Sequence, residues 1–482
     1  MSLFSQLLTE YIHRKNIRTY SLAEYCGIDP SMMYKIIRGK RTPASIDTID
    51  KISAFLKLTP GEYKELRTAY QITQVGYENY YRRRDMFDFL NNFQEIANIG
   101  SLAPSFMTMS EYPNPLVALN NETEVNHAVF TAVTSQIQKG QGRIRMLVRP
   151  DYQFLIHLLT SASPGGSNLV ISHMICLNNT EQVTAAKKNY NLHCLMNILP
   201  LCACGYQYQP RYYYENVSSQ LETFPLFPYL ILTDEYAVVL SGTLQAGFLT
   251  RQQDLLAMLS RIFGHAAALS RPLLTKIDNI YDQLKYVQQI LDADSAIEFT
   301  FQMTPCMTAL LPAHYLDKYI NPQLPSREIF IKHFEAHIRG TYARHVQRNH
   351  VLIFSEEGIQ EFLQTGHLEE YPSYVYTPFE KEDRIHLIRL LVGELRSGLY
   401  QMRMLKQSIG SVRSGANIYI TPNAGYLLFT PLNSGTPIYL NIEEAGLLQT
   451  FLDFFDTMEE SLFYSPEETI NRLELLLQEY TS

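Results

Sequence analysis

Residues 19–39 encode two short helices joined by a three-residue turn, and this pattern restricts how the surrounding chain can fold. The segment TYSLAEYC (19–26) has helical apolar spacing, with Thr19 as an expected cap. It ends at Gly27, because a helix C-terminus often adopts a positive φ that glycine tolerates best. Asp29-Pro30 then supplies a capping residue and a proline at the first helical position. The next helix contains SMMYKIIR and stops at Gly39, so the sequence predicts a helix-turn-helix.

Three further helices are predicted around this motif. They are FSQLLTEYIHRK (4–15), SIDTIDKISAFLKL (45–58) and TPGEYKELRTAYQI (59–72), the last with Thr59 as its expected cap. Apolar residues of the second motif helix should pack on the neighbouring helices, with Met33, Ile36 and Ile37 facing Leu22, Ala23 and Ile49. The first 72 residues are therefore expected to form a small all-α domain.

Charge is unevenly distributed between this domain and the remaining chain. The whole sequence has a formal net charge of −8. Residues 1–72 contain eleven Lys and Arg against seven Asp and Glu, a net +4, which leaves −12 for residues 73–482. Such asymmetry indicates a basic module attached to a larger acidic body.

The motif resembles a known DNA-binding family. LAEYCGIDPSMMYKIIRGKRTP (22–43) has the Leu-Ala pair, the turn glycine, the apolar residue after it and the R-G-K-R-x-P ending of lambda-repressor-like (XRE/Cro) proteins. The resemblance covers about residues 3–70. Members often carry Gln near the start of the first motif helix and Glu before the final Arg-Gly, where this chain has Thr19 and Ile37.

The resemblance implies that the second motif helix reads double-stranded DNA in the major groove. Ser31, Met32 and Tyr34 are the expected base-reading residues, and Lys35 is expected to contact a base or a phosphate. Arg38, Lys40 and Arg41 are expected to bind phosphates, which position a module without specifying sequence. Thr19 completes the candidate DNA contacts. The competing interpretation is a small helical domain with an ordinary solvated charged face.

Lambda-repressor-like proteins usually pair two recognition helices, so a homodimer is expected. Residues 77–99 look helical, with Phe87, Leu90, Phe93 and Ile96 as an apolar stripe. This stripe fits either intramolecular core or a dimer seam. The arginines at 82–84 fit either phosphate contacts or a solvated face.

The remainder of the chain alternates strand-like and helical apolar runs, which is an α/β or α+β pattern. The expected strands are RIRMLV (143–148), YLIL (229–232), YAVVL (236–240), IYI (418–420) and YLLF (426–429), and the expected helices are LLAMLSRIF (255–263) and LLQTFLDFF (447–455).

A weak internal repeat suggests a duplicated unit. SQIQKGQGRIRML (135–147) aligns with GELRSGLYQMRML (393–405), and the two later pairs of strands and helices also correspond. The predicted organisation is a DNA-binding domain at 1–72, a helical connector at 73–125, and two α/β sensor halves at 126–275 and 276–482.

Such a pair of halves resembles the duplicated phospholipase-D-like regions of some transcription regulators. The H-x-K-x4-D signature of that family does not occur, and neither do a G-x-G-x-x-G loop, a G-x4-G-K-[ST] loop or a G-x-S-x-G elbow. We therefore expect no enzymatic activity and no cofactor.

Three polar clusters have both a functional and a structural interpretation. His173, Cys176, His193, Cys194, Cys202 and Cys204 could hold zinc or sense oxidation, or could be buried core residues. His333 and His337 lie one helical turn apart, as in a metal pair, although a solvated face is favoured. The tyrosine-rich run at 205–217 fits half-buried strand packing better than a binding pocket.

The predicted protein is a cytoplasmic transcription regulator whose C-terminal region senses a small-molecule or peptide effector or mediates oligomerisation. Six Cys in 482 residues favour reduced thiols. No apolar run reaches the length of a membrane span, so no membrane partner is expected. The alternative is a regulator with a helical C-terminal receptor domain for a peptide or protein partner.

Overall fold

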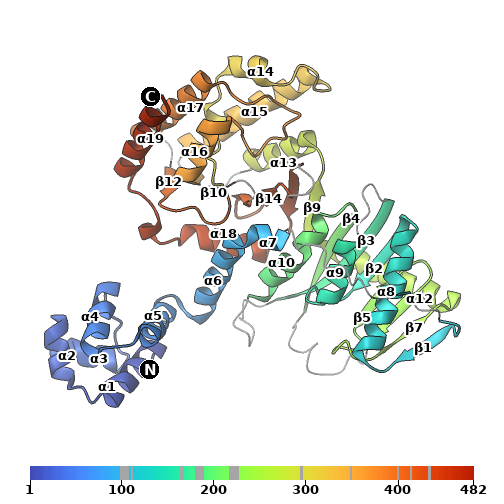
Figure 1. Ribbon diagram of the computed structural model, residues 1–482, viewed down its shortest axis with the longest axis horizontal. Coiled ribbons are helices and arrows are strands. Elements are labelled where there is room, and N and C mark those ends of the chain that lie inside the picture. The colour runs from blue at the N-terminus through green and yellow to red at the C-terminus, as the bar shows by residue number, and fades with distance from the viewer. Residues whose placement is uncertain are drawn as a thin grey trace. The chain divides into compact units, whose positions relative to one another are not determined.

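The computed structural model divides the chain into two compact units. The first contains residues 1–85 together with 181–189, and the second contains 86–180 and 190–482 (Figure 1). The described residues are 1–97, 108–109, 112–162, 168–179, 189–215, 227–293, 297–347, 350–398, 401–412, 415–431 and 436–481. No helix within these ranges combines the length and apolar character that a membrane crossing requires.

The N-terminal unit is built from short helices around one apolar core. The helices are α1 (Leu3–Arg14), α2 (Thr19–Cys26), α3 (Pro30–Ile37), α4 (Ile46–Leu56) and α5 (Pro60–Val75). Met33 and Ile36 of α3 are buried in the same cluster as Leu22, Ala23 and Ile49, with Ile37 partly buried against it. The predicted packing of the second motif helix is confirmed.

Local capping explains most of the helix ends. Gly27 ends α2 with a φ of 67°, and the Asp29 carboxylate accepts hydrogen bonds from the backbone N–H groups of Ser31 and Met32. Thr59 and Glu62 form a reciprocal capping box at the start of α5. The expected cap of α2 is wrong: Thr19 is the first helical residue, the cap position is Arg18, and no side chain caps this end.

The division between the units falls within α6 (Tyr77–Asn91), which is followed by α7 (Phe93–Ala97). In α6 and α7, the residues that face the core of the second unit include Met86, Phe89, Leu90 and Phe93, while Phe87 is exposed. The predicted apolar stripe is therefore wrong at Phe87, which faces solvent. Leu90 and Phe93 of the stripe belong to the intramolecular core. Residues 98 and 99 of the predicted helix lie outside the described residues.

The first sheet of the second unit spans residues 116–272. Its order is β1-β7-β6-β5-β2-β3-β4-β8; β2, β3 and β4 are parallel neighbours and the remaining pairs are antiparallel. Its strands are β1 (Leu116–Leu119), β2 (Gln141–Leu147), β3 (Asn168–Asn178), β4 (Gln207–Glu215), β5 (Tyr229–Leu232), β6 (Ala237–Leu240), β7 (Gly247–Thr250) and β8 (Arg271–Pro272). Its helices are α8 (Glu122–Gln138), α9 (Gln153–Ser161), α10 (Tyr190–Cys202) and α12 (Gln253–Leu269).

The second sheet spans residues 274–442. Its order is β12-β11-β10-β13-β14-β15-β9, with β10, β11 and β12 parallel. Its strands are β9 (Leu274–Ile277), β10 (Glu298–Phe301), β11 (His350–Ser355), β12 (Gln401–Leu405), β13 (Asn417–Ile420), β14 (Gly425–Phe429) and β15 (Ile438–Ile442). The associated helices are α13 (Ile280–Asp292), α14 (Ala313–Tyr319), α15 (Arg327–Val346), α16 (Glu356–Thr365), α17 (Lys381–Ser397), α18 (Ala445–Asp456) and α19 (Pro466–Thr481), with short 3-10 turns η1 (Thr308–Leu310) and η2 (Glu460–Leu462).

The two sheets share one topology apart from the short edge strand β8, which has no counterpart among the described strands of the second sheet. In each, the first strand of the half pairs with the last antiparallel strand, and three parallel strands are followed by three antiparallel ones. β5 and β6 correspond to β13 and β14, as the sequence alignment predicted. The alignment of the earlier segments was wrong, because β2 corresponds to the central strand β10, whereas β12 lies at the sheet edge.

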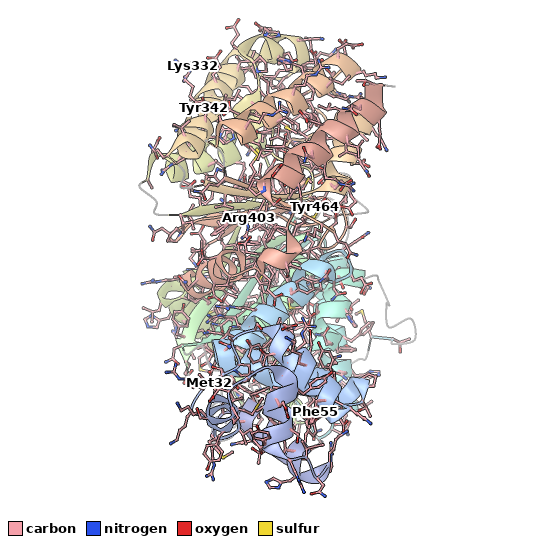
Figure 2. All side chains as sticks on the ribbon, turned by 90° about the vertical axis from the view of Figure 1, so that its left-hand side faces the viewer. Met32, Phe55, Lys332, Tyr342, Arg403 and Tyr464 are labelled. Carbon is pink, nitrogen blue, oxygen red and sulfur yellow. The ribbon has the colours of Figure 1, made fainter. Side chains whose placement is uncertain are left out.

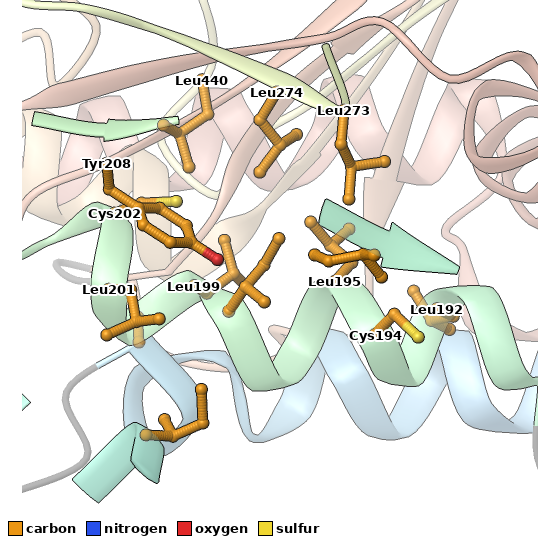
Figure 3. Close-up of a cluster of buried hydrophobic side chains, with 14 of the residues drawn as sticks. Leu192, Cys194, Leu195, Leu199, Leu201, Cys202, Tyr208, Leu273, Leu274 and Leu440 are labelled. Carbon is orange, nitrogen blue, oxygen red and sulfur yellow. The ribbon is translucent and has the colours of Figure 1, made fainter. Parts of the chain in front are cut away.

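A large apolar core unites the second unit. It contains residues from both sheets and from α8, α9, α10 and α18. Figure 3 shows part of it, where leucines of α10 lie close to Leu273, Leu274 and Leu440. A multidomain chain with an all-α N-terminal domain and an α/β C-terminal region is confirmed, while the four segment boundaries stay predictions.

Candidate nucleic-acid interface

The outer side of α3 presents large side chains to solvent. Met32 and Tyr34 are 40% and 54% exposed, and Ser31 and Lys35 are exposed beside them. Met32 lies on the surface of the N-terminal unit in Figure 2. Because Met33 and Ile36 are held in the core, the helix is fixed with this side outward.

The first residue of this surface, Ser31, also takes part in the helix cap. Its hydroxyl donates to the Asp29 carboxylate at 2.5 Å, and this bond, with the two backbone N–H groups, lowers the pKa of Asp29. The Ser31 hydroxyl oxygen can still accept a hydrogen bond. Ser31 is therefore suited to face a donor on a base edge, such as an exocyclic amino group.

Four basic residues surround the C-terminal end of α3, and we call them the α3 basic group: Lys35, Arg38, Lys40 and Arg41. All four are exposed, and residues 30–46 contain no acidic side chain. The guanidinium of Arg38 lies over the ring of Tyr34, 5.0 Å from its centroid. The contact places Arg38, which is expected to bind a phosphate, next to Tyr34, which is expected to read a base.

Several acidic side chains of the domain form ion pairs on other elements, and Asp29 caps the N-terminus of α3. Glu62 pairs with Arg14 and Lys15, and Asp47 pairs with Lys51. By contrast, no ion pair engages the α3 basic group anywhere in the described part of the chain. The α3 basic group therefore remains available to bind phosphates.

Gly39 fixes the direction in which the chain leaves α3. Its φ is +70°, and a Cβ there would lie 2.6 Å from the Ser5 Oγ and 3.0 Å from the Ser2 backbone nitrogen. The tight passage against the start of α1 sets the positions of Lys40 and Arg41.

Gly39→Ala should destabilise the N-terminal domain by about 2–3 kcal/mol, since left-handed strain adds to the clash. Gly27→Ala is the matched control, because Gly27 has a φ of +67° but nothing within 4 Å of an added Cβ. It should cost only ~1 kcal/mol. Urea unfolding of the two variants measures the difference, and equal losses would contradict a role for the close contact at Gly39.

The N-terminus of α2 adds a feature that the sequence did not reveal. Thr19 is half-buried, and Arg18 and Tyr20 on either side of it are exposed, Tyr20 by 67%. Since no side chain caps α2, its first N–H groups are oriented to receive an anion such as a phosphate.

The other predicted clusters have structural roles. Cys194 and Cys202 are buried core residues of α10 (Figure 3), and burial raises the pKa of the Cys202 thiol to about 12. Across the described residues, no three His, Cys, Asp or Glu side chains gather closely enough to hold a metal ion.

The tyrosine-rich run forms β4, whose alternating burial confirms half-buried strand packing; residues 216 and 217 lie outside the described ranges. The preference for a solvated face was wrong for His337, whose ring lines a cavity.

The predicted alternative of a solvated face is wrong for Arg82 of α6, which is buried, whereas Arg84 is exposed. Arg82 is 7% exposed and donates to the Asn79 side chain at 2.8 Å, and Arg84 pairs with Asp85. Arg82 and Arg84 therefore have structural partners.

Comparison with known proteins identifies the N-terminal domain. Residues 8–66 match the family described as the Cro/C1-type HTH DNA-binding domain, so the predicted membership of this domain is confirmed. No curated protein matches the chain.

Solved structures with partial similarity include three proteins. TrmBL2, an archaeal chromatin protein, is 9% identical with a TM-score of 0.21, over 51% of this chain and 84% of that one. Phosphatidylserine synthase from Haemophilus influenzae Rd KW20 is 9% identical with a TM-score of 0.23, over 76% of this chain and 93% of the synthase. Polyphosphate kinase from Porphyromonas gingivalis is 10% identical with a TM-score of 0.19, over 79% of this chain and 58% of the kinase.

Proposed function

We propose that this protein is a sequence-specific, non-enzymatic transcription regulator that binds double-stranded DNA as a homodimer. The observation that carries the proposal is the α3 basic group, exposed and free of ion pairs within the described residues, beside an outward recognition helix. Ser31, Met32, Tyr34 and Lys35 would read bases, and the rest of the group would bind phosphates. Because its target is chromosomal DNA, the proposal includes a cytoplasmic location.

The C-terminal region would receive a small-molecule or peptide signal and change DNA affinity. Such regulation requires a ligand that binds the DNA-competent and incompetent arrangements unequally. The alternative of a helical receptor domain is less well supported, since strands make up more than a fifth of the described residues between 100 and 482.

An uncovered helix in the second unit supports dimerisation. α12 buries only Leu256 and Phe263, and its apolar Met258, Ile262 and Leu269 share one exposed face, at 39%, 56% and 76%. Its topological counterpart α18 also follows the last antiparallel strand of its sheet, but is largely buried within the chain. We assign a second copy of α12 as the cover of this face, because paired half-sites require paired readers.

The double variant Ile262→Glu, Leu269→Glu should be monomeric and should bind a palindromic site about 100-fold more weakly than the wild type, through loss of bivalent binding. Sedimentation velocity and fluorescence anisotropy measure these effects. Gln253→Glu, Gly264→Glu adds the same charge on the other side of α12 and should stay dimeric. A dimeric Ile262/Leu269 variant, or a monomer with undiminished affinity, would contradict the proposal.

A further inference from the structure

One face of the second sheet is unusually polar for a buried surface. The residues of this polar face are Glu298, Thr300, Gln302, His350, Tyr419, Tyr426 and Tyr439. The opposite face of the same strands is apolar, with Phe299, Phe301, Ile418, Ile420, Leu427 and Leu440 in the core. Buried polar residues are costly unless each is hydrogen-bonded, so their partners reveal whether they serve only the fold.

A cavity of about 60 Å³ lies over the polar face. Its other walls come from Gln283 of α13, from His337 and Thr341 of α15, and from Glu370 in the connection between α16 and α17. This volume holds a few water molecules or a ligand of a few non-hydrogen atoms.

Most polar groups around the cavity have partners within the protein. The Thr300 hydroxyl lies 2.6 Å from the His350 Nε2, and the Tyr419 hydroxyl donates to Glu298 at 2.8 Å. Glu298 also lies 3.6 Å from the Arg344 guanidinium, so this buried carboxylate has a counter-charge. These contacts leave the polar face itself electrically balanced.

Buried side chains on the cavity wall that lack hydrogen-bond partners within the described part of the chain include Glu370, Gln283 and the Nδ1 of His337. Among the described residues, neither carboxylate oxygen of Glu370 and neither side-chain amide atom of Gln283 makes a hydrogen bond of normal geometry. The polar side chains of Gln302, Cys306 and Thr308 lie near the Glu370 carboxylate and favour its charged form, but none of them carries a positive charge. Glu370 and Gln283 are 9% and 3% exposed. Burial raises the pKa of Glu370 to about 7. The cavity therefore combines an acceptor that needs a positive partner with an amide that can both donate and accept.

Aromatic rings complete the surroundings of Glu370. Tyr371, Tyr419, Tyr426 and Tyr439 all line the cavity. The faces of such rings attract cations, and their attraction is strongest where water is excluded. Glu370 has no counter-ion among the described residues and is surrounded by tyrosines. Such a site favours a ligand that carries a positive charge and also has an apolar part.

We propose that this cavity binds a small organic cation of the alkylammonium class, with Glu370 as its counter-ion and Gln283 as a further hydrogen-bond partner. The ammonium group would satisfy the Glu370 oxygens, and its alkyl part would contact Leu284, Val287 and Leu428, which also line the cavity. An effect of the bound cation on DNA affinity rests on the proposed regulator function. Binding of the cation to the cavity does not depend on that function.

The test uses the full-length protein and ethylammonium chloride, with ethanol as the neutral isostere and sodium chloride to match ionic strength. A ligand of three non-hydrogen atoms cannot bind much more tightly than ~1 mM, so the titration extends to about 50 mM. At pH 8, ethylammonium should raise the unfolding temperature by about 2–4 °C. Ethanol should not raise it.

Glu370→Gln keeps the shape and removes the charge, and should abolish the shift. Glu382→Gln, at an exposed site in the first turn of α17, is the matched control and should retain it. No shift in the wild type, an equal shift with ethanol, or an undiminished shift in Glu370→Gln would each overturn the cation site.

A second readout separates the site from the regulator. Ethylammonium should change the DNA affinity of the wild type, measured by anisotropy, and leave that of Glu370→Gln unchanged. A thermal shift without any change in DNA affinity would overturn the regulatory role and support the site. Failure of the protein to bind any DNA would overturn the proposed function, while the thermal shift still decides on the site.

Discussion

Replacing all four residues of the α3 basic group with glutamine should weaken DNA binding about 100- to 1000-fold at physiological salt. Each substitution removes the attraction of one cation for a phosphate and the release of the counterion condensed there. The slope of log K against log salt should also become less negative, by about 0.9 for each phosphate that is no longer neutralised. Folding should be retained, because these side chains are exposed and have no ion pairs within the described residues.

A matched variant removes the same charge from other elements of the domain. Its substitutions are Arg14→Gln, Lys51→Gln, Lys57→Gln and Lys64→Gln, on or beside α1, α4 and α5. Anisotropy titrations at several salt concentrations should show only a small decrease in affinity for this variant. Equal decreases for both variants would mean that net charge, not the surface around α3, determines binding.

Glu370→Gln should increase the free energy of unfolding by about 3 kcal/mol at pH 8 and change it little at pH 5. The pKa of Glu370 is raised by burial from 4.5 to about 7, and a tenfold change in acid strength corresponds to ~1.4 kcal/mol. Because the folded state binds the proton more tightly, stability falls as pH rises from about 4.5 to about 7. Glutamine cannot ionise, so the variant avoids this loss.

Neighbouring groups should contribute little to the difference between variant and wild type. Burial keeps the pKa of Cys306 and Tyr371 raised, and lowers the pKa of His337 to about 4. Urea unfolding at pH 5 and pH 8 measures the effect, with Glu382→Gln as a control that should follow the wild type. A pH dependence that is identical in Glu370→Gln and wild type would contradict an ionisable, unpartnered Glu370.

The helix-turn-helix was predictable because its determinants are local. Gly27, Asp29 and Thr59 act within one turn of their own positions, and the apolar spacing of α3 names the residues that it buries. Strands such as β5 and β14 were found for the same reason, since their runs are continuously apolar. The absence of a side-chain cap on α2 could not be predicted, because threonine is a common capping residue and Thr19 lies at the start of this helix.

Long-range pairing was not predictable from local pattern. β2 and β12 each follow a helix and then a glycine with positive φ, Gly140 and Gly398, so their sequences look alike. Their places in the two sheets differ because strand order is set by tertiary contacts.

The cavity was missed because its polar residues look solvent-exposed in sequence. β10 alternates Glu298 and Thr300 with phenylalanines, which resembles a half-exposed strand, yet all four of its residues are buried. His337 lies in a strongly polar helix, and only the packing of α15 over the second sheet encloses its ring. A signal existed in α13, where Gln283 interrupts an otherwise apolar face of Ile280, Leu284 and Val287.

The most direct test of sequence-specific binding is an in vitro selection of bound DNA from a random library. Full-length protein is compared with a Tyr34→Ala, Lys35→Ala double variant, which alters the outer side of α3 and leaves its buried side intact. The wild type should enrich a palindrome with half-sites about one helical turn apart, and the variant should not enrich that palindrome. Enrichment of no motif by the wild type, or of the same motif by both proteins, would contradict the assignment of α3 as the reader of DNA sequence.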